Sequence, residues 1–267
     1  MMLDAITPVI LTYNESPNIA RTLGQLQWAR EVVVVDSFST DDTVAIATTF
    51  PNVRVLTRKF DSHADQWNYA AFETGITSPW ILALDADYFV PDEAVKEISA
   101  IDPDTTFDGY TASFRYCVWG DPLRGTLYPP VTVLFRRAKG HFFQDGHTHR
   151  LKLDGKAAPL SHKLLHDDRK PISHWLSAQD RYMKLEAENI CAKPWDLLPL
   201  PDKVRTFPLI APFAVFGNCY FLKGGMLDGK AGLYYALQRM LAEALLGLRI
   251  IESRIGKSRK SQSRTGD

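Results

Sequence analysis

Carboxylates follow one apolar segment of this chain at a spacing that suits binding of a divalent cation and of phosphate. Asp85 and Asp87 come directly after the apolar run 80–84, one residue apart. Two carboxylates in this arrangement can hold Mg²⁺ or Mn²⁺ through oxygen ligands, while phosphate oxygens fill the remaining positions of the cation. Asp-x-Asp is also common in solvated turns, so its meaning depends on the element that carries it.

Two further polar clusters begin at the last residues of the segments 8–12 and 32–36. They are Thr12, Tyr13, Asn14 and Glu15 at the end of the first segment, and Asp36, Ser37, Ser39 and Asp41 at the end of the second. Each cluster alone is as compatible with a turn and a helix cap as with a binding site. If the apolar segments are parallel strands of one sheet, all three clusters lie at its carboxyl edge, where open α/β sheets bind ligands.

The pattern from residue 8 to about 118 predicts this sheet. Short β-branched runs alternate with helical stretches, which is typical of βα units and a mostly parallel sheet. Strands are expected at 8–12, 32–36, 53–57, 80–84 and roughly 109–118. Helices are expected after Ser16 as the capping residue, from about Thr40 to Pro51, over about 64–76 and over about 171–192.

These motifs together resemble family-2 glycosyltransferases of the GT-A fold. The resemblance covers about residues 6–150 and rests on Thr12–Glu15, Asp36–Thr43, Gln66 and Asn68 in the third helix, and Leu84–Asp87. More loosely, Leu165-His166 and the segment 225–232 resemble the subgroup that contains bacterial lipopolysaccharide-core β-glucosyltransferases.

The resemblance implies transfer of a sugar, with inversion, from a nucleotide sugar to a glycan or glycolipid. It implies that Mg²⁺ or Mn²⁺ is bound by Asp87 with Asp85, and that Thr12, Tyr13 and Asp36 surround the base and ribose. We also assign Asn14, Glu15, Ser37, Gln66, Asn68 and Asp85 to the nucleotide-sugar site. A divalent cation there would neutralise the charge of the nucleoside diphosphate leaving group.

The general base for the acceptor hydroxyl is left open by the sequence. Inverting transfer needs a base, usually a carboxylate. The subgroup often has Glu after His, but Arg150 stands at that position in this chain. His149 or Asp145 could act as the base instead, and Arg150 could bind an anionic acceptor or the diphosphate.

Six of the seven histidines fall between His141 and His174, which raises the question of a metal site. Zinc normally requires a closed set of ligands, and the three cysteines are not spaced to supply them. A single histidine, His166, could join Asp87 on the catalytic cation. The alternative, for His166 as for the others, is a histidine in the core or facing the acceptor.

Composition indicates a globular protein with an uneven distribution of charge. Lys and Arg number 31, as do Asp and Glu, and 45% of residues are hydrophobic, which excludes disordered and collagenous proteins. Residues 1–100 carry six basic and fourteen acidic side chains, whereas 203–267 carry eleven and four. No secretory signal is evident at the N-terminus, and the odd cysteine count favours a reducing compartment.

The C-terminal region combines apolar residues with basic charge. The apolar segment 207–222 is broken by proline and glycine and is short for a bilayer-spanning helix, which needs about 20 residues. A helix is expected over 231–252, with an apolar stripe that includes Leu233, Leu237, Leu241 and Leu248. Such a helix could lie on an anionic membrane, or pack on protein.

We therefore expect an α/β GT-A domain over residues 1–170, with a nucleotide-sugar-binding half (1–118) and an acceptor-side half (119–170). A helical, membrane-interfacial extension (171–253) and a flexible basic tail (254–267) should follow. The expected location is cytoplasmic, peripheral at the cytoplasmic face of the inner membrane, with no nucleic-acid partner. The alternatives are a catalytically weakened membrane scaffold, or a nucleotidyltransferase, which should have a Gly-rich phosphate loop where Thr12–Glu15 stand.

Overall fold

The computed structural model of the protein describes residues 2–145 and 148–264, with side chains up to residue 256 except those of 145 and 148. The chain forms two compact units. Unit 1 comprises Met1–Pro122 and Leu127–Lys170, and unit 2 comprises Leu123–Thr126 and Pro171–Asp267.

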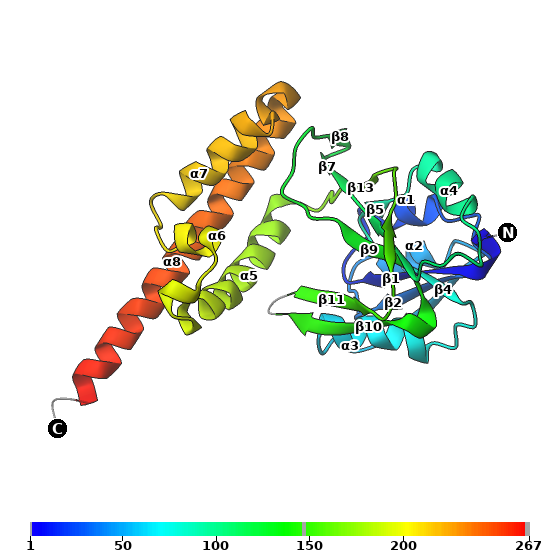
Figure 1. Ribbon diagram of the computed structural model, residues 1–267, viewed down its shortest axis with the longest axis horizontal. Helices are drawn as coiled ribbons and strands as arrows, with labels where there is room; N and C mark the ends of the chain where they lie inside the picture. Colours follow the sequence, from blue (N-terminus) through cyan, green and yellow to red (C-terminus); the bar gives the residue numbers. More distant parts are fainter. Residues whose placement is uncertain (1, 146–147, 265–267) are drawn as a thin grey trace. The chain divides into compact units, whose positions relative to one another are not determined.

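Unit 1 is built on a seven-stranded mixed sheet with the order β12-β6-β9-β4-β1-β2-β3 (Figure 1). These strands are β1 (Ile6–Thr12), β2 (Val32–Asp36), β3 (Val53–Thr57), β4 (Trp80–Asp85), β6 (Gly109–Ala112), β9 (Val131–Arg136) and β12 (Ala157–Pro159). The first four are mutually parallel, and β9 runs antiparallel between β4 and β6. The predicted α/β GT-A architecture is confirmed, and the carboxyl ends of β1, β2 and β4 meet at one edge.

The strands are apolar because helices cover both faces of the sheet. Alternate residues of a strand point to opposite faces. Thus Val32 and Val34 belong to one buried cluster, which includes residues of α1 (Ile19–Gly24) and α4 (Asp92–Ser99). Val33 and Val35 belong to the other, with α3 (His63–Asn68) and the following turn η2 (Tyr69–Glu73).

Two predicted helices of unit 1 begin later than expected. Helix α1 begins at Ile19 with Asn18 as its N-cap residue, so the expected capping role of Ser16 is wrong. The backbone N–H of Ser16 instead donates to Asp41 Oδ2 at 3.1 Å. Helix α2 (Thr43–Ala47) likewise begins after the polar cluster that follows β2. Both starts are displaced because hydrogen bonds between the two loops hold the residues that local pattern assigned to the helices.

A smaller sheet brings residues that are distant in the sequence to the end of β4. Its order is β5 (Tyr88–Phe89), β13 (Leu164–His166), β7 (Phe114–Val118) and β8 (Asp121–Pro122). Strand β13 pairs antiparallel with β5, which sets His166 opposite Tyr88. The single strand expected over 109–118 is therefore two strands, β6 and β7, which belong to different sheets. A hairpin, β10 (Gly140–Asp145) and β11 (Thr148–Leu153), forms separately.

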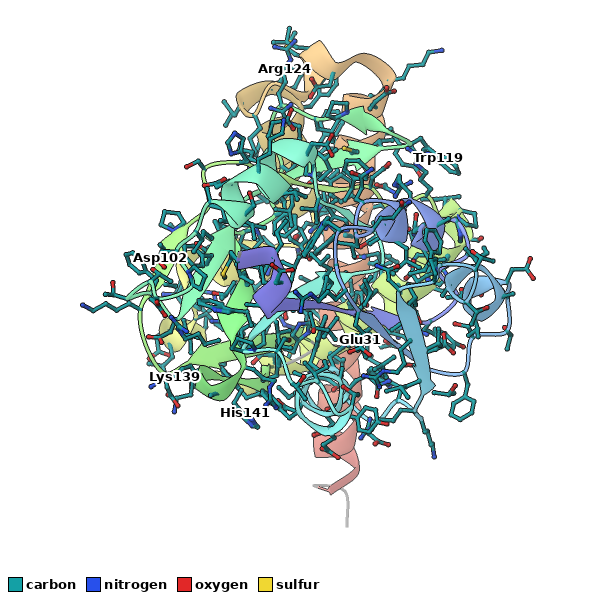
Figure 2. All side chains as sticks on the ribbon, turned by 90° about the vertical axis from the view of Figure 1, so that its right-hand side faces the viewer. Glu31, Asp102, Trp119, Arg124, Lys139 and His141 are labelled. Atoms are coloured by element: carbon teal, nitrogen blue, oxygen red, sulfur yellow. The ribbon has the colours of Figure 1, made fainter. Side chains whose placement is uncertain are left out.

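Unit 2 is helical. It contains α5 (Ile172–Ala192), η4 (Trp195–Leu197), α6 (Leu200–Arg205), α7 (Ala211–Gly217), η5 (Asn218–Leu222), η6 (Gly225–Asp228) and α8 (Gly229–Arg264). Helices α5 and α7 both pack against α8. Arg124, labelled in Figure 2, pairs with Asp228 at 3.1 Å and joins the segment 123–126 to this unit. Helix α8 continues beyond residue 252, so the segment expected to be flexible is helical as far as Arg264.

None of the helices within residues 2–145 and 148–264 combines the length and the apolar character that crossing a membrane requires.

Candidate active site at the carboxyl edge of the sheet

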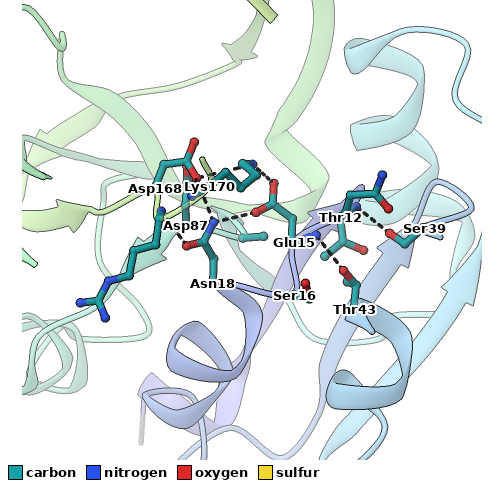
Figure 3. Close-up of polar contacts among 12 residues, drawn as sticks. Thr12, Glu15, Ser16, Asn18, Ser39, Thr43, Asp87, Asp168 and Lys170 are labelled. Carbon is teal, nitrogen blue, oxygen red and sulfur yellow. Dashed lines mark hydrogen bonds and ion pairs between the residues drawn. The ribbon is translucent and has the colours of Figure 1, made fainter. Parts of the chain in front are cut away.

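The loops after β1 and β2 are hydrogen-bonded to one another (Figure 3). Thr12 Oγ1 donates to Asp36 Oδ1 at 2.9 Å, and the Asn14 backbone N–H donates to Ser39 Oγ at 2.8 Å. Asn14 has a φ of +54°, a left-handed conformation that asparagine tolerates better than most residues. The two predicted clusters therefore form one continuous polar edge.

Asp36 lies at the centre of this edge. Its side chain is buried and accepts hydrogen bonds from Thr12 and from both the backbone N–H and the hydroxyl of Ser39, at 2.8 and 2.5 Å. Tyr13 and Phe38 flank it and expose 53% and 61% of their surfaces. Exposed aromatic rings beside a fixed carboxylate can receive a flat, polar-edged ligand such as a nucleoside.

Of the two predicted residues in α3, Gln66 faces this edge and Asn68 does not. Gln66 Nε2 donates to Ser37 Oγ at 3.1 Å, and its Oε1 accepts from Arg58 at 2.5 Å. Asn68 instead forms two hydrogen bonds with the backbone of Phe142 in β10, at 2.8 and 2.9 Å. Its amide thus fixes the hairpin.

Asp85, Asp87 and His166 lie together at the end of β4. His166 Nε2 is 3.1 Å from Asp87 Oδ2, and Tyr88 and Tyr128 pack against the imidazole ring. Asp87 is 9% exposed, and its Oδ1 has no hydrogen-bond partner among the described residues. A buried carboxylate oxygen without a partner is unfavourable unless a ligand satisfies it.

Burial and neighbouring charges shift the pKa values at this site in opposite directions. Burial and the negative charge of Asp87 raise the pKa of Asp85 to about 6. For Asp87, burial would raise the pKa, but the charges of His166 and Lys170 outweigh it and lower the pKa. Burial would lower the pKa of His166, but the charge of Asp87, the hydrogen bond to it and the charge of Asp85 together raise that pKa. Asp87 and His166 therefore form an ion pair, and Asp85 holds its proton more strongly than usual.

The predicted metal ligands fit an open cation site better than a closed one. Among residues 2–145 and 148–264, no three His, Cys, Asp or Glu side chains are grouped so that they could hold a metal ion by themselves. Mg²⁺ in nucleotide enzymes usually takes only one or two carboxylates and completes its shell with phosphates and water. The unpaired Oδ1 of Asp87 beside Asp85 suits that arrangement, whereas His166 is engaged with Asp87.

A half-buried Lys–Glu pair borders the same site, and no sequence pattern predicts its lysine (Figure 3). Lys170 Nζ lies 2.5 Å from Glu15 Oε1 and 3.7 Å from Asp168 Oδ1. Burial raises the pKa of Glu15 to about 7, although Lys170 opposes the shift. The rule that polar residues after strands form binding sites also applies to 167–170, which follow the short strand β13.

The predicted acceptor-side residues lie on the β10–β11 hairpin. His149 contacts the rings of His63 and Trp67, with centroids 5.7 and 5.8 Å away. Burial and His63 lower the pKa of His149 to about 4, so its imidazole is neutral at pH 7 and weakly basic. Arg150 is exposed. Asp145 ends β10, and its side chain lies outside the described part of the chain.

Comparison with known proteins identifies the family. Residues 7–156, more than half of the chain, match the model of glycosyl transferase family 2. The chain belongs to glycosyl transferase family 2. Family membership is therefore confirmed, whereas the lipopolysaccharide-core subgroup stays a prediction.

Two glycosyltransferases of similar sequence match only part of the chain. A glycosyltransferase of Rickettsia felis is 36% identical over 111 residues, which are 41% of this chain and 38% of the relative. The glycosyltransferase SunS of Bacillus subtilis is 35% identical over 100 residues, 36% of this chain and 23% of SunS. The match thus spans well under half the length of these relatives.

A solved structure of similar fold matches most of this chain. S. aureus TarS in complex with UDP-GlcNAc covers 94% of this chain and 92% of its own, with a TM-score of 0.50 and 16% identity. This similarity supports the GT-A fold.

Proposed function

We propose that the protein is an inverting glycosyltransferase that moves a sugar from a nucleoside-diphosphate sugar, a UDP-hexose, to a membrane-associated glycan or glycolipid. The observation that carries this proposal is the buried Asp87 carboxylate, with one oxygen unpaired, beside Asp85 at the carboxyl edge of the sheet. Family membership and the TarS fold, which accommodates a UDP-sugar, support it.

The residues of the edge divide into two functions. Asp36, with Thr12 and the Tyr13 ring beside it, would bind the base and ribose. Asp87 and Asp85 would hold Mg²⁺ or Mn²⁺, which supplies charge neutralisation to the departing nucleoside diphosphate when bound.

His166 can join the cation only after it loses the proton that it shares with Asp87, because a protonated imidazole cannot ligate a metal. Lys170 adds a positive charge next to the two aspartates. That charge favours an incoming diphosphate.

The acceptor side of the proposed reaction involves the β10–β11 hairpin. His149 and Asp145 remain the candidates for the base, and Arg150 would bind an anionic group of the acceptor. We propose an acceptor of the lipopolysaccharide-core or lipid-linked class, used at the cytoplasmic face of the inner membrane. The basic balance of residues 203–267 supports this choice.

Asp87→Asn tests the proposal. Release of UDP from UDP-glucose in the presence of Mn²⁺ should fall by at least about 100-fold, because the amide removes the charge that holds the cation. Asp104→Asn, at an exposed carboxylate of the same unit, should leave turnover unchanged.

Undiminished turnover by Asp87→Asn would exclude the assignment. If the unaltered protein binds UDP but never turns over any UDP-hexose, the non-catalytic scaffold is the better description.

A further inference from the structure

Helix α8 exposes a continuous apolar stripe along its length. Successive members are three, four or seven residues apart, so they share one face of the helix. They are Leu233, Leu237, Leu241, Leu248, Ile251 and Ile255, each between 38% and 63% exposed. Single exposed leucines are ordinary on protein surfaces, but a stripe of six is typical of an interaction surface.

The stripe is exposed because the opposite side of α8, which includes the buried Ala242, Leu246 and Ile250, faces the interior of unit 2. Glu243 is 3% exposed and lies 3.2 Å from Arg205 of α6, which also pairs with Glu186 of α5 at 3.2 Å. Arg249 pairs with Asp180 of α5 at 2.5 Å. These ion pairs and the buried apolar contacts fix the rotation of α8, so the six residues of the stripe point away from the bundle.

A second exposed apolar set lies on the segment that packs against α8 (Figure 1). Helix α7 turns Ala211 and Pro212 inward. The residues around it and in η5 are strongly exposed: Leu209, Ile210, Phe213, Phe221 and Leu222 expose between 57% and 83% of their surfaces. Unit 2 therefore presents much more apolar surface than a freely soluble helical bundle needs.

Charge decides which partner suits this surface. The sequence of α8 contains eight basic and two acidic residues. Both acidic residues, Glu243 and Glu252, are ion-paired with arginines. Two copies of so basic a helix would repel each other if they paired along the stripe, whereas an anionic lipid surface attracts basic side chains and accepts apolar ones.

We propose that the α8 stripe is a docking surface for an anionic membrane, with α8 lying in the plane of the lipid headgroups. The inference deepens the proposed function and rests on its membrane-associated acceptor. The apolar side chains enter the acyl boundary, and the basic residues of α8, such as Lys230 and Arg254, face phosphate headgroups.

Vesicle co-sedimentation of the full chain tests the surface independently of turnover. The probe is a phosphatidylcholine vesicle containing phosphatidylglycerol, compared with phosphatidylcholine alone. The unaltered protein should bind the anionic vesicles and dissociate at high salt. The triple variant Leu237→Glu/Leu241→Glu/Leu248→Glu should bind roughly tenfold or more weakly, since it loses apolar contact and gains negative charge.

A charge-matched variant separates the two effects. Ser173→Glu/Ser177→Glu/Asn189→Glu adds the same three charges to exposed positions of α5 and should retain most of the binding. Equal binding by the leucine variant, or no binding of the unaltered protein to anionic vesicles, would overturn the proposal. The proposal would also be overturned if the unaltered protein were a dimer that binds no vesicles and the leucine variant were a monomer. UDP release from UDP-glucose, measured on the same samples, reports separately on the proposed function.

Discussion

Asp36 and Asp87 are both buried carboxylates of the edge, yet their hydrogen bonds give them different roles. Asp36 accepts from Thr12 and twice from Ser39, which fixes the loops after β1 and β2. Asp87 is bound on one oxygen by His166, and its other oxygen has no partner among the described residues. A saturated carboxylate organises a site, whereas an unsatisfied one is available to a ligand.

The sequence predicted these two aspartates but not all of their neighbours. Asp36 and Asp87 follow strands that the pattern identifies, so their convergence needed only a parallel sheet. His166 lies 79 residues from Asp87, and only the family resemblance suggested that they might meet. Lys170 was missed because no local pattern distinguishes a buried lysine from an exposed one.

His149 allows a prediction of pH dependence. Its pKa is lowered to about 4 in the folded protein, against about 6.5 when unfolded. Between these values the unfolded state binds the additional proton, so stability should fall as pH drops from about 6.5 to 4, by up to about 3 kcal/mol. His149→Phe should remove that part of the loss in urea unfolding. Turnover of UDP-glucose at pH 7 by the folded variant separates the two candidates for the base: lost turnover identifies His149, and retained turnover leaves Asp145.

At the scale of elements, strands were easier to predict than helix starts. The apolar runs of β1, β2 and β4 are buried on both faces, so composition marks them, and β3 at the sheet edge is half-buried but rich in valine. The start of α1 depends on hydrogen bonds such as that from Ser16 to Asp41, which tertiary structure creates. The division of 109–118 into β6 and β7 has the same origin, since the two halves pair with different strands.

Asn68 tests whether α3 serves the hairpin or the nucleotide. Asn68→Ala leaves the backbone N–H and C=O of Phe142 without their partners, which should lower the free energy of unfolding by about 1–3 kcal/mol. The rise in melting temperature caused by UDP with Mn²⁺ should be unchanged. Asn68→Asp, which keeps the acceptor for the Phe142 N–H, should lose less stability. Unchanged stability together with loss of the UDP effect would place Asn68 in the nucleotide site.

At the scale of the whole molecule, the net charge of zero sums over two units of different chemistry. The fourteen acidic side chains of residues 1–100 include those at the proposed cation site. The basic excess of residues 203–267 belongs to unit 2, where α8 carries most of it. Periodicity predicted an apolar stripe on α8 but not its direction, because the side of α8 that becomes buried depends on how α5 and α7 pack against it.

Two compact units should also unfold as two steps. Thermal unfolding should resolve two transitions. UDP with Mn²⁺ should raise the midpoint temperature of the unit 1 transition only, because ligand binding stabilises the unit that holds the site. Arg205→Met should lower the free energy of unfolding of unit 2 only, by about 3 kcal/mol, because it leaves the buried Glu243 without its positively charged partner. Arg181→Met, at an exposed arginine of α5, is the matched control and should change neither. A single unfolding transition, with a midpoint temperature that both UDP and Arg205→Met shift, would mean that the two units unfold cooperatively as one.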